Sequence, residues 1–153
     1  MDRWMAAVLA AAVVSGATAP AFAGESRATR AEAESMVKRG VEAVKKERDK
    51  AYVDMTAPSR TYVDRDLYLV VYDMNGRCLA HGQNAKQVGK DLIELKDPDG
   101  KPFVRERVEL GKAKGKFWQD YKFTDPLTKA VLPKQMYCEA LGDVLVCGGV
   151  YKS

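Results

Sequence analysis

The sequence predicts an α+β fold in which one long N-terminal helix packs on a five-stranded antiparallel sheet. Three observations support this fold class: apolar residues at helical spacing over residues 28–56, a β-rich run on each side of Asn75-Gly76, and three more β-rich runs after residue 115. The strands fall into two groups separated by one mixed helical segment. The helices are therefore segregated from the strands and do not alternate with them.

We expect the first residues to lie outside this domain. A basic residue, Arg3, precedes an apolar run over residues 4–14, and Ala21-Phe22-Ala23 provides the small side chains of a cleavage site. This layout is typical of a secretory signal peptide, and the apolar run is too short to span a bilayer comfortably as an uncleaved anchor. The sequence therefore predicts a signal peptide over residues 1–23 and a single periplasmic or secreted domain over residues 24–153.

The composition argues against nucleic-acid binding, metal centres and catalysis. The net charge is only +4, and the charges in "KKERDK" and "VRERVEL" are interleaved, which indicates solvated helix faces. A single histidine and three cysteines without a CxxC pair offer little support for zinc or haem. No nucleophile is paired with a base, so we expect a non-enzymatic protein without a cofactor.

The long helix is expected over residues 28–56. Thr29 and Glu32 have the spacing of a capping box, and Pro58 ends the helix. One face carries apolar side chains at helical spacing: Ala33, Val37, Val41, Val44, Ala51, Tyr52 and Met55. A single narrow stripe cannot form a core alone, so this helix must pack against another element.

A β-hairpin is expected around Asn75-Gly76, the strongest short-range signal for a two-residue turn. Such a turn sets three pairs of residues opposite each other: Asp73 with Cys78, Tyr72 with Leu79, and Val70 with His81. Strand alternation then places one set on a common face: Val70, Tyr72, Leu79 and His81.

The second half of the chain is expected to hold one helix and three strands. Short helical or turn pieces follow Gly82, and Pro102 suits the first position of a helix that runs to about Ala113. The strands are predicted in "KFWQDYKFT", "KQMYCEAL" and "DVLVCGGVYK", with Gly142-Asp143 as the turn between the last two.

The order of motifs from Leu67 to Tyr151 resembles that of the single Cache domains, the PAS-like extracytoplasmic sensor modules of bacterial chemoreceptors and kinases. The shared pattern is "YD.NG…AH…..VGK.L..LKD.DGK.F…..EL….G…W.DY.F..P.TK…PK..Y". The resemblance implies a small-ligand pocket between the sheet and the segments after its second strand. It also implies short organic acids, amino acids or similar metabolites as ligands. Relatives usually signal through a transmembrane helix. Because this sequence stops at Ser153, we expect a free-standing secreted form.

Four residues match family positions that line or border this pocket: Trp118, Tyr121, Lys134 and Tyr137. A small carboxylate needs a cation and directional donors in a mostly apolar cavity, and Lys134 would supply the charge. The hydroxyl groups of Tyr121 and Tyr137 would be the donors. Strand alternation places Trp118 and Tyr121 on opposite faces, so both line one cavity only if a β-bulge intervenes; otherwise the rings belong to the core.

His81 and Phe103 are two further candidates for ligand contact. His81 ends the second strand, where it could bind an acid, titrate near neutral pH, or hold the loop backbone. Phe103 could cap the cavity or belong to the core. Cys138 and Cys147 lie opposite each other around the last turn, so a cross-strand disulfide is one prediction. The alternatives are buried thiols, or a bridge from Cys78 to one of the two.

These features predict an exported ligand-binding domain that recognises a small organic acid or similar polar metabolite and serves signal transduction or chemotaxis. The expected partner is a separate membrane sensor protein. The alternative is a non-catalytic interaction protein with a vestigial pocket, which would use the N-terminal helix to form a homodimer or to dock on a membrane kinase.

Overall fold

The computed structural model describes residues 26–152, so the predicted signal peptide over residues 1–23 lies outside the described residues. The elements are α1 (Arg30–Lys46), α2 (Arg48–Met55), β1 (Val63–Asp64), β2 (Leu67–Asp73), β3 (Cys78–His81), the 3-10 turn η1 (Ala85–Gln87), α3 (Phe103–Lys114), β4 (Lys116–Thr124), β5 (Val131–Leu141) and β6 (Val144–Tyr151). Within this part of the chain, no helix is both long and apolar enough to cross a membrane.

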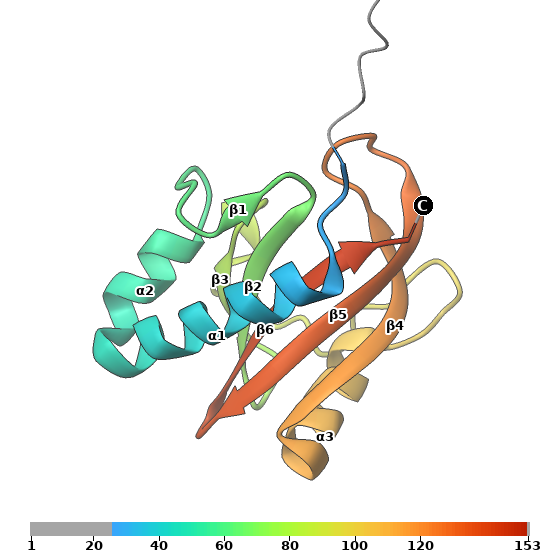
Figure 1. Ribbon diagram of the computed structural model, residues 1–153. Helices are drawn as coiled ribbons and strands as arrows, with labels where there is room; N and C mark the ends of the chain where they lie inside the picture. Colours follow the sequence, from blue (N-terminus) through green and yellow to red (C-terminus); the bar gives the residue numbers. More distant parts are fainter. Residues whose placement is uncertain (1–25, 153) are drawn as a thin grey trace, which may run out of the picture.

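One antiparallel sheet organises the domain (Figure 1). Its main order is β1-β2-β6-β5-β4, and β3 pairs with the same edge of β2 as β1 does. The predicted α+β class and antiparallel sheet are confirmed, and the very short β1 is an addition to the five expected strands.

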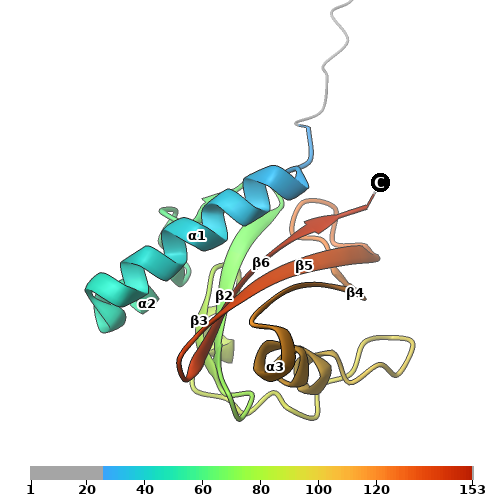
Figure 2. The same cartoon turned by 60° about the horizontal axis from the view of Figure 1, so that its bottom comes forward.

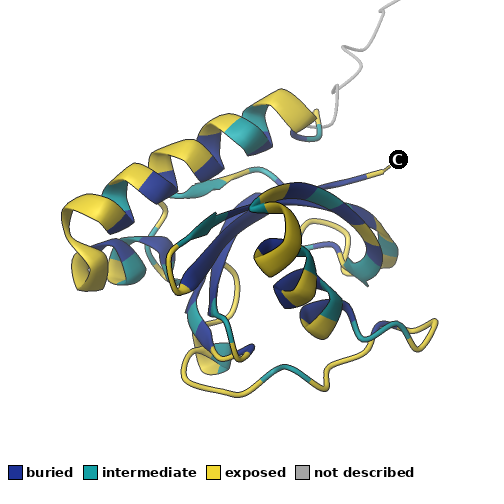
Figure 3. Ribbon diagram, turned by 90° about the horizontal axis from the view of Figure 1, so that it is seen from below, coloured by how far each residue is buried: buried dark blue, intermediate teal, exposed yellow. Residues whose placement is uncertain are grey.

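The sheet separates two layers (Figure 2). Helix α1 lies across one face, while α3 and the long segment between β3 and α3 lie on the other. Figure 3 shows that the buried residues of α1 and α3 face the sheet and that the exposed residues face solvent. The core is correspondingly split: an aliphatic cluster lies under α1, and an aromatic-rich cluster lies under α3.

The start of α1 follows the predicted capping box. The Thr29 hydroxyl accepts from the backbone N–H of Glu32 at 3.3 Å, and the Glu32 carboxylate accepts from the N–H of Thr29 at 2.7 Å. The buried side chains then follow the predicted stripe, from Ala33 to Val44.

The prediction of a single helix over residues 28–56 is wrong at Glu47. This residue leaves the helical conformation (φ −149°, ψ 86°), and the chain turns into α2 at Arg48. A straight helix of that length would run about 40 Å, well beyond the ~25 Å width of five strands. The elbow returns Ala51 and Met55 to the core, where both are buried.

The β2–β3 hairpin contains a bulge that the sequence analysis did not predict. Val70 pairs with His81 as expected, but Tyr72 pairs with Cys78 and not with Leu79. The N–H of Gly76 donates to the Asp73 carbonyl at 3.1 Å, and Gly76 takes a φ of +87°. The turn is therefore centred one residue earlier than predicted, with Gly76 in the left-handed bulge position. Cys78 consequently faces the α3 layer and Leu79 the α1 layer, the reverse of the prediction.

The β5–β6 hairpin turns at Gly142-Asp143 as predicted, since Leu141 pairs with Val144. The same register pairs Cys138 with Cys147, and the structure joins these two residues in a disulfide. Cys78 is a buried free thiol. Strand β5 begins at Val131, before the predicted "KQMYCEAL" segment.

Candidate ligand-binding site

A pocket lies on the α3 face of the sheet. Its inner cavity has a volume of about 20 Å³ and is lined by side chains of β2, β3, β4, β5 and α3 and of the segment between β3 and α3. An outer hollow of about 170 Å³ shares Tyr68, His81, Gln87 and Phe123 with the inner one and opens beside the β4–β5 loop. The inner space holds about one water molecule, so the two spaces together suit a ligand of only a few heavy atoms.

Lys134 of β5 lies behind Tyr68, which lines both spaces, and is 1 % exposed. Its Nζ lies 3.0 Å from the Tyr68 hydroxyl and 3.2 Å from the Tyr151 hydroxyl. The lysine chain lies across Gly149 of β6, where a Cβ atom would come within 2.7 Å of the lysine Cε. Burial, with a further contribution from Arg107, holds the pKa of Lys134 well below its usual range.

Arg107 of α3 packs against Tyr72, Phe103 and Tyr121, which line the inner cavity, and is completely buried. Its Nε donates to Gln119 Oε1 at 2.9 Å, and its Nη1 donates to the Tyr72 hydroxyl at 3.1 Å. The guanidinium carbon lies 4.7 Å from the ring centroid of Tyr121. Nη2 is buried without a hydrogen-bond partner among the described residues. This nitrogen is therefore free to donate to a bound acceptor.

Neither basic side chain has a counter-ion. Among residues 26–152, no carboxylate forms an ion pair with Lys134 or Arg107. Buried charges in proteins are normally paired. Lys134 and Arg107 are each hydrogen-bonded to a tyrosine that lines the inner cavity, Tyr68 and Tyr72 respectively, so two buried basic groups lie directly behind its wall.

His81 is placed between the inner and outer spaces and stacks on Tyr68, with ring centroids 5.4 Å apart. Its Nδ1 accepts from the backbone N–H groups of Gln83 and Asn84 at 3.2 and 3.0 Å. In the neutral ring this leaves Nε2 as the protonated donor. Burial lowers the pKa of His81 to about 4, so the ring stays neutral at physiological pH.

Aromatic rings form one wall of the pocket. Phe103 of α3 stacks on Tyr121 at 4.7 Å and meets Phe123 edge-on at 5.9 Å. The Phe103 carbonyl also accepts from the side-chain amide of Gln119 at 2.9 Å, which holds Gln119 against Arg107. Phe103 and Tyr121 therefore lie in the pocket as predicted, and Tyr121 supports the Arg107 guanidinium.

The structure places Trp118 and Tyr137 on the opposite face of the sheet, so they do not join the other four predicted residues. The β4–β5 register has no bulge, and alternation therefore points Trp118 away from Tyr121. Under α1, the Trp118 indole donates to Glu34 at 3.2 Å, and the Tyr137 hydroxyl donates to Glu139 at 2.7 Å. Neither side chain reaches the pocket.

The pocket contains residues that the sequence analysis missed. Arg107 stands in "VRERVEL", which was interpreted as a solvated face, yet it lies one helical turn from the buried Phe103 and Gly111. That i, i+4 spacing was the available signal. Tyr68 and Tyr72 flank Val70 at strand period, and Tyr151 ends β6. No motif marked these tyrosines.

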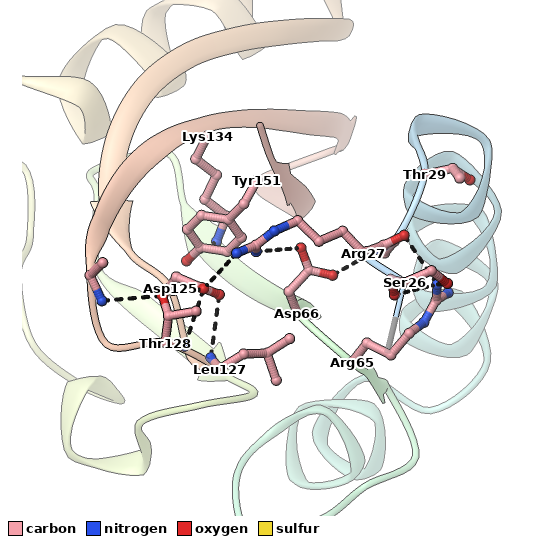
Figure 4. Close-up of polar contacts among 12 residues, drawn as sticks. Ser26, Arg27, Thr29, Arg65, Asp66, Asp125, Leu127, Thr128, Lys134 and Tyr151 are labelled. Atoms are coloured by element: carbon pink, nitrogen blue, oxygen red, sulfur yellow. Dashed lines mark hydrogen bonds and ion pairs between the residues drawn. The ribbon is translucent and has the colours of Figure 1, made fainter. Parts of the chain in front are cut away.

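A polar cluster fastens the chain before α1 to the pocket rim (Figure 4). Arg27 bridges two buried carboxylates, at 3.4 Å from Asp66 and 2.9 Å from Asp125. Asp125 follows β4 at the outer hollow and also accepts from the Thr128 hydroxyl at 2.6 Å. Asp66 accepts from the N–H of Ala28 at 2.8 Å.

A larger hollow of about 570 Å³ lies between α2 and the β3–η1 segment, but its chemistry differs. Its lining is mostly apolar and contains no charged side chain. It therefore lacks the groups that recognise a small ion, and the pocket under α3, which has Lys134 and Arg107 directly behind its wall, remains the candidate site.

Three solved structures with similar folds come from chemotaxis proteins or are described as a chemosensory domain. A methyl-accepting chemotaxis protein from Vibrio parahaemolyticus matches with a TM-score of 0.67 and 23 % identity, over 79 % of this chain and 86 % of that one. A Cache chemosensory domain described for carboxylic acid recognition matches with a TM-score of 0.68 and 20 % identity, over 80 % and 92 %. The periplasmic sensor domain of a chemotaxis protein matches with a TM-score of 0.65 and 23 % identity, over 80 % and 90 %.

Sequence comparisons agree with the fold. The sensor histidine kinase MctS of Rhizobium johnstonii is 30 % identical over 95 residues, which is 61 % of this chain. The aligned part is only 20 % of the length of that kinase. The family model described as Single Cache domain 2 matches residues 18–152. Single Cache domains are extracytoplasmic sensor modules that bind ligands and do not catalyse reactions. The chain belongs to the Single Cache domain 2 family.

Proposed function

We propose that this protein is an extracytoplasmic sensor domain that binds a small carboxylate in the pocket under α3. The observation that carries the proposal is the pair of buried basic side chains, Lys134 and Arg107, without a counter-ion among the described residues. A carboxylate would accept from Arg107 Nη2 and the Lys134 amine, and the His81 ring would add a neutral donor. The solved Cache domain described for carboxylic acid recognition is consistent with this ligand class.

The pocket favours organic acids over amino acids. An amino acid brings an ammonium group, which needs an acceptor or a carboxylate beside it. The inner cavity is lined by no acidic side chain. Asp125, at the outer hollow, is already bound to Arg27 and Thr128. We therefore expect propionate to bind better than alanine, which differs from it by that ammonium group.

We further propose that residues 1–23 act as a cleaved signal peptide and that the bound state is read by a separate membrane sensor protein. The interleaved charges of α1 leave an exposed polar face for such a contact or for a second copy of the chain. Edman sequencing of the exported protein tests the first point: the mature chain should begin at Gly24, and an intact Met1 would contradict cleavage.

A thermal-unfolding screen with acetate, propionate, pyruvate, lactate and succinate tests the ligand class, with glycine and alanine as matched amino acids. An acid at 100 times its dissociation constant should add about 2.7 kcal/mol to the free energy of unfolding. Lys134→Ala should weaken that binding by about 1.5–3 kcal/mol, the scale of a charged hydrogen bond. Lys38→Ala, on the exposed face of α1, is the control and should bind like the wild type.

Two results would overturn the proposal. If no acid raises the unfolding temperature, and the protein is a stable dimer in analytical ultracentrifugation, the vestigial-pocket alternative is correct. If an acid binds with unchanged affinity to Lys134→Ala, the site lies elsewhere.

A further inference from the structure

The hydrogen bonds of Lys134 match an uncharged amine. A neutral lysine has two N–H donors, whereas an ammonium group has three. Lys134 has two hydroxyl partners, Tyr68 and Tyr151. The Tyr151 hydroxyl donates its hydrogen bond to the carbonyl of Thr124 at 2.6 Å, so toward Lys134 it can act only as an acceptor. Among residues 26–152, no third acceptor exists for the extra N–H of a charged Lys134.

The nearest carboxylates do not serve as counter-ions for Lys134. Asp66 and Asp125 exert an attraction on it that is weaker than the effect of burial and of Arg107. Figure 4 shows why: both carboxylates point to Arg27, which bridges them. The other oxygen of each accepts from a backbone N–H, that of Ala28 for Asp66 and that of Leu127 for Asp125. Arg27 is the cation in ion-pair contact with both carboxylates, and Lys134 forms an ion pair with neither of them among residues 26–152.

Titratable and charged groups face Lys134 from every element around it: Arg27 before α1, Asp66 and Tyr68 at β2, His81 on β3, Arg107 on α3, Tyr121 on β4, Asp125 after β4, and Tyr151 on β6. The tyrosine rings favour the charged form, because Nζ lies 4.1 Å from the Tyr68 centroid and 4.5 Å from that of Tyr151. Such contacts are worth less than the desolvation of an unpaired ammonium group, which burial of this residue makes the largest effect, so the neutral form prevails.

We propose that Lys134 is uncharged in the empty pocket and takes up one proton from solvent when a carboxylate binds. The Nζ lone pair accepts the proton, and the new N–H donates to a ligand oxygen, which supplies both the missing acceptor and the missing counter-ion. The carboxylate remains an anion throughout. This inference rests on the proposed carboxylate site and adds how that site is regulated.

Proton uptake makes the site respond to the product of anion and proton concentrations. Above the pKa of Lys134 in the empty pocket, affinity should fall about tenfold for each unit of pH. The acid itself stays ionised in that range, since carboxyl groups titrate near pH 4. The protein would therefore report the concentration of the undissociated acid, and a single acid at constant total concentration would give a stronger signal in more acidic surroundings.

NMR of the full chain with 13C at the lysine Cε positions tests the proposal directly. The Lys134 signal is assigned by its loss in Lys134→Met, and the exposed Lys38 and Lys112 provide internal references. The protein is titrated from pH 6 to pH 10 twice, first free of any organic acid and then in 100 mM acetate, with propionate as the second probe. We expect Lys134 to be neutral at pH 8 in the first titration and charged at pH 8 in the second.

Each outcome decides the matter. A Lys134 signal that is already charged at pH 8 without acid overturns the inference but leaves the carboxylate site intact. The same holds if acid binding shifts neighbouring signals while Lys134 stays neutral. If neither acetate, propionate nor any acid of the screen binds, the proposed function itself fails. The titration without acid still measures the charge of Lys134 in that case, so the two failures can be told apart. Arg107→Met provides a further check, because removal of this cation should raise the pH at which Lys134 titrates in the empty protein.

Discussion

The guanidinium of Arg107 is held by geometry as much as by charge. Its fork reaches Gln119 on one side and Tyr72 on the other, and the ring of Tyr121 lies beside its plane. Nη2 is buried and has no hydrogen-bond partner within normal distance among the described residues. A lysine would carry the same charge but could not make this fork.

Arg107→Lys should therefore impair ligand binding although the net charge is unchanged. We expect propionate affinity to fall about 10- to 100-fold, the scale of one or two lost charged hydrogen bonds, measured by isothermal titration calorimetry. Arg105→Lys is the matched control, because Arg105 stands two residues earlier on the same helix and is exposed. Equal affinity in the two variants would show that charge alone suffices.

His81 should make the fold sensitive to acid. Burial lowers its pKa to about 4 in the folded state, against an ordinary value near 6.5. Between these values the unfolded chain binds a proton that the folded chain does not, so stability falls as pH drops from about 6.5 to about 4. The free energy of unfolding falls by at most about 3 kcal/mol through this effect.

His81→Asn should remove this part of the pH dependence. An asparagine oxygen can occupy the place of Nδ1 and keep both backbone N–H groups of Gln83 and Asn84 satisfied. Urea unfolding at pH 7, 6, 5 and 4 measures the effect, and His81 is the single histidine of the chain. Parallel curves for the variant and the wild type would mean that His81 binds its proton equally well in the folded and the unfolded state.

At the scale of elements, the position of α3 depends on a close approach to β6. A Cβ atom built on Gly111 would lie 2.4 Å from Leu145 Cδ2 and within 3.2 Å of two more atoms of that side chain. Gly111 stands one helical turn after Arg107, so a shift of α3 also moves the guanidinium. The helix thus couples packing to ligand geometry.

Gly111→Ala should lower the free energy of unfolding by about 1–3 kcal/mol, the cost of overpacking a core. This is the opposite of the gain that the same change gives in an exposed helix. Propionate binding should weaken as well. Lys112→Ala, the exposed neighbour, is the control for urea unfolding and calorimetry. A more stable Gly111→Ala variant would indicate that Leu145 yields without cost.

The elements themselves could largely be predicted from local signals. Apolar period, the capping box at Thr29 and the turn at Gly142-Asp143 all gave the right structure. The failures came from tertiary geometry. The break at Glu47 reflects the width of the sheet, which local spacing does not encode, and the shifted turn reflects the choice of Gly76 for the bulge position. Residue propensities alone predict neither the helix break at Glu47 nor the position of the turn.

At the scale of the whole molecule, the disulfide between Cys138 and Cys147 closes a short loop with a sequence separation of 9. Loop-closure entropy predicts that its reduction costs about 2–3 kcal/mol. The unreduced protein, unfolded in guanidinium and treated with iodoacetamide, should gain one label by mass spectrometry, at Cys78, and three after reduction. Three labels before reduction would show that no intramolecular bridge forms.

The site was predicted in part, for a reason visible at this scale. Family motifs or strand ends marked His81, Phe103 and Tyr121, which line the pocket, and Lys134, which lies behind its wall; their contact with a ligand stays a prediction. Arg107 and Tyr151 were missed because burial of a polar residue depends on which distant elements cover it. Strand alternation on β4 correctly predicted that Trp118 points away from Tyr121, because the β4–β5 register contains no bulge that would turn Trp118 to the other face.

The two faces of the sheet have a consequence for mutational tolerance. On β4, Phe117, Gln119 and Tyr121 face α3, while Trp118 faces α1. In a saturation scan selected once for folding and once for acid response, losses at odd-numbered positions of β4 should include variants that fold but do not respond. Losses at Trp118 should appear in both selections together. Substitutions at neighbouring positions of β4 would then cause different defects, in acid response on the α3 face and in folding on the α1 face.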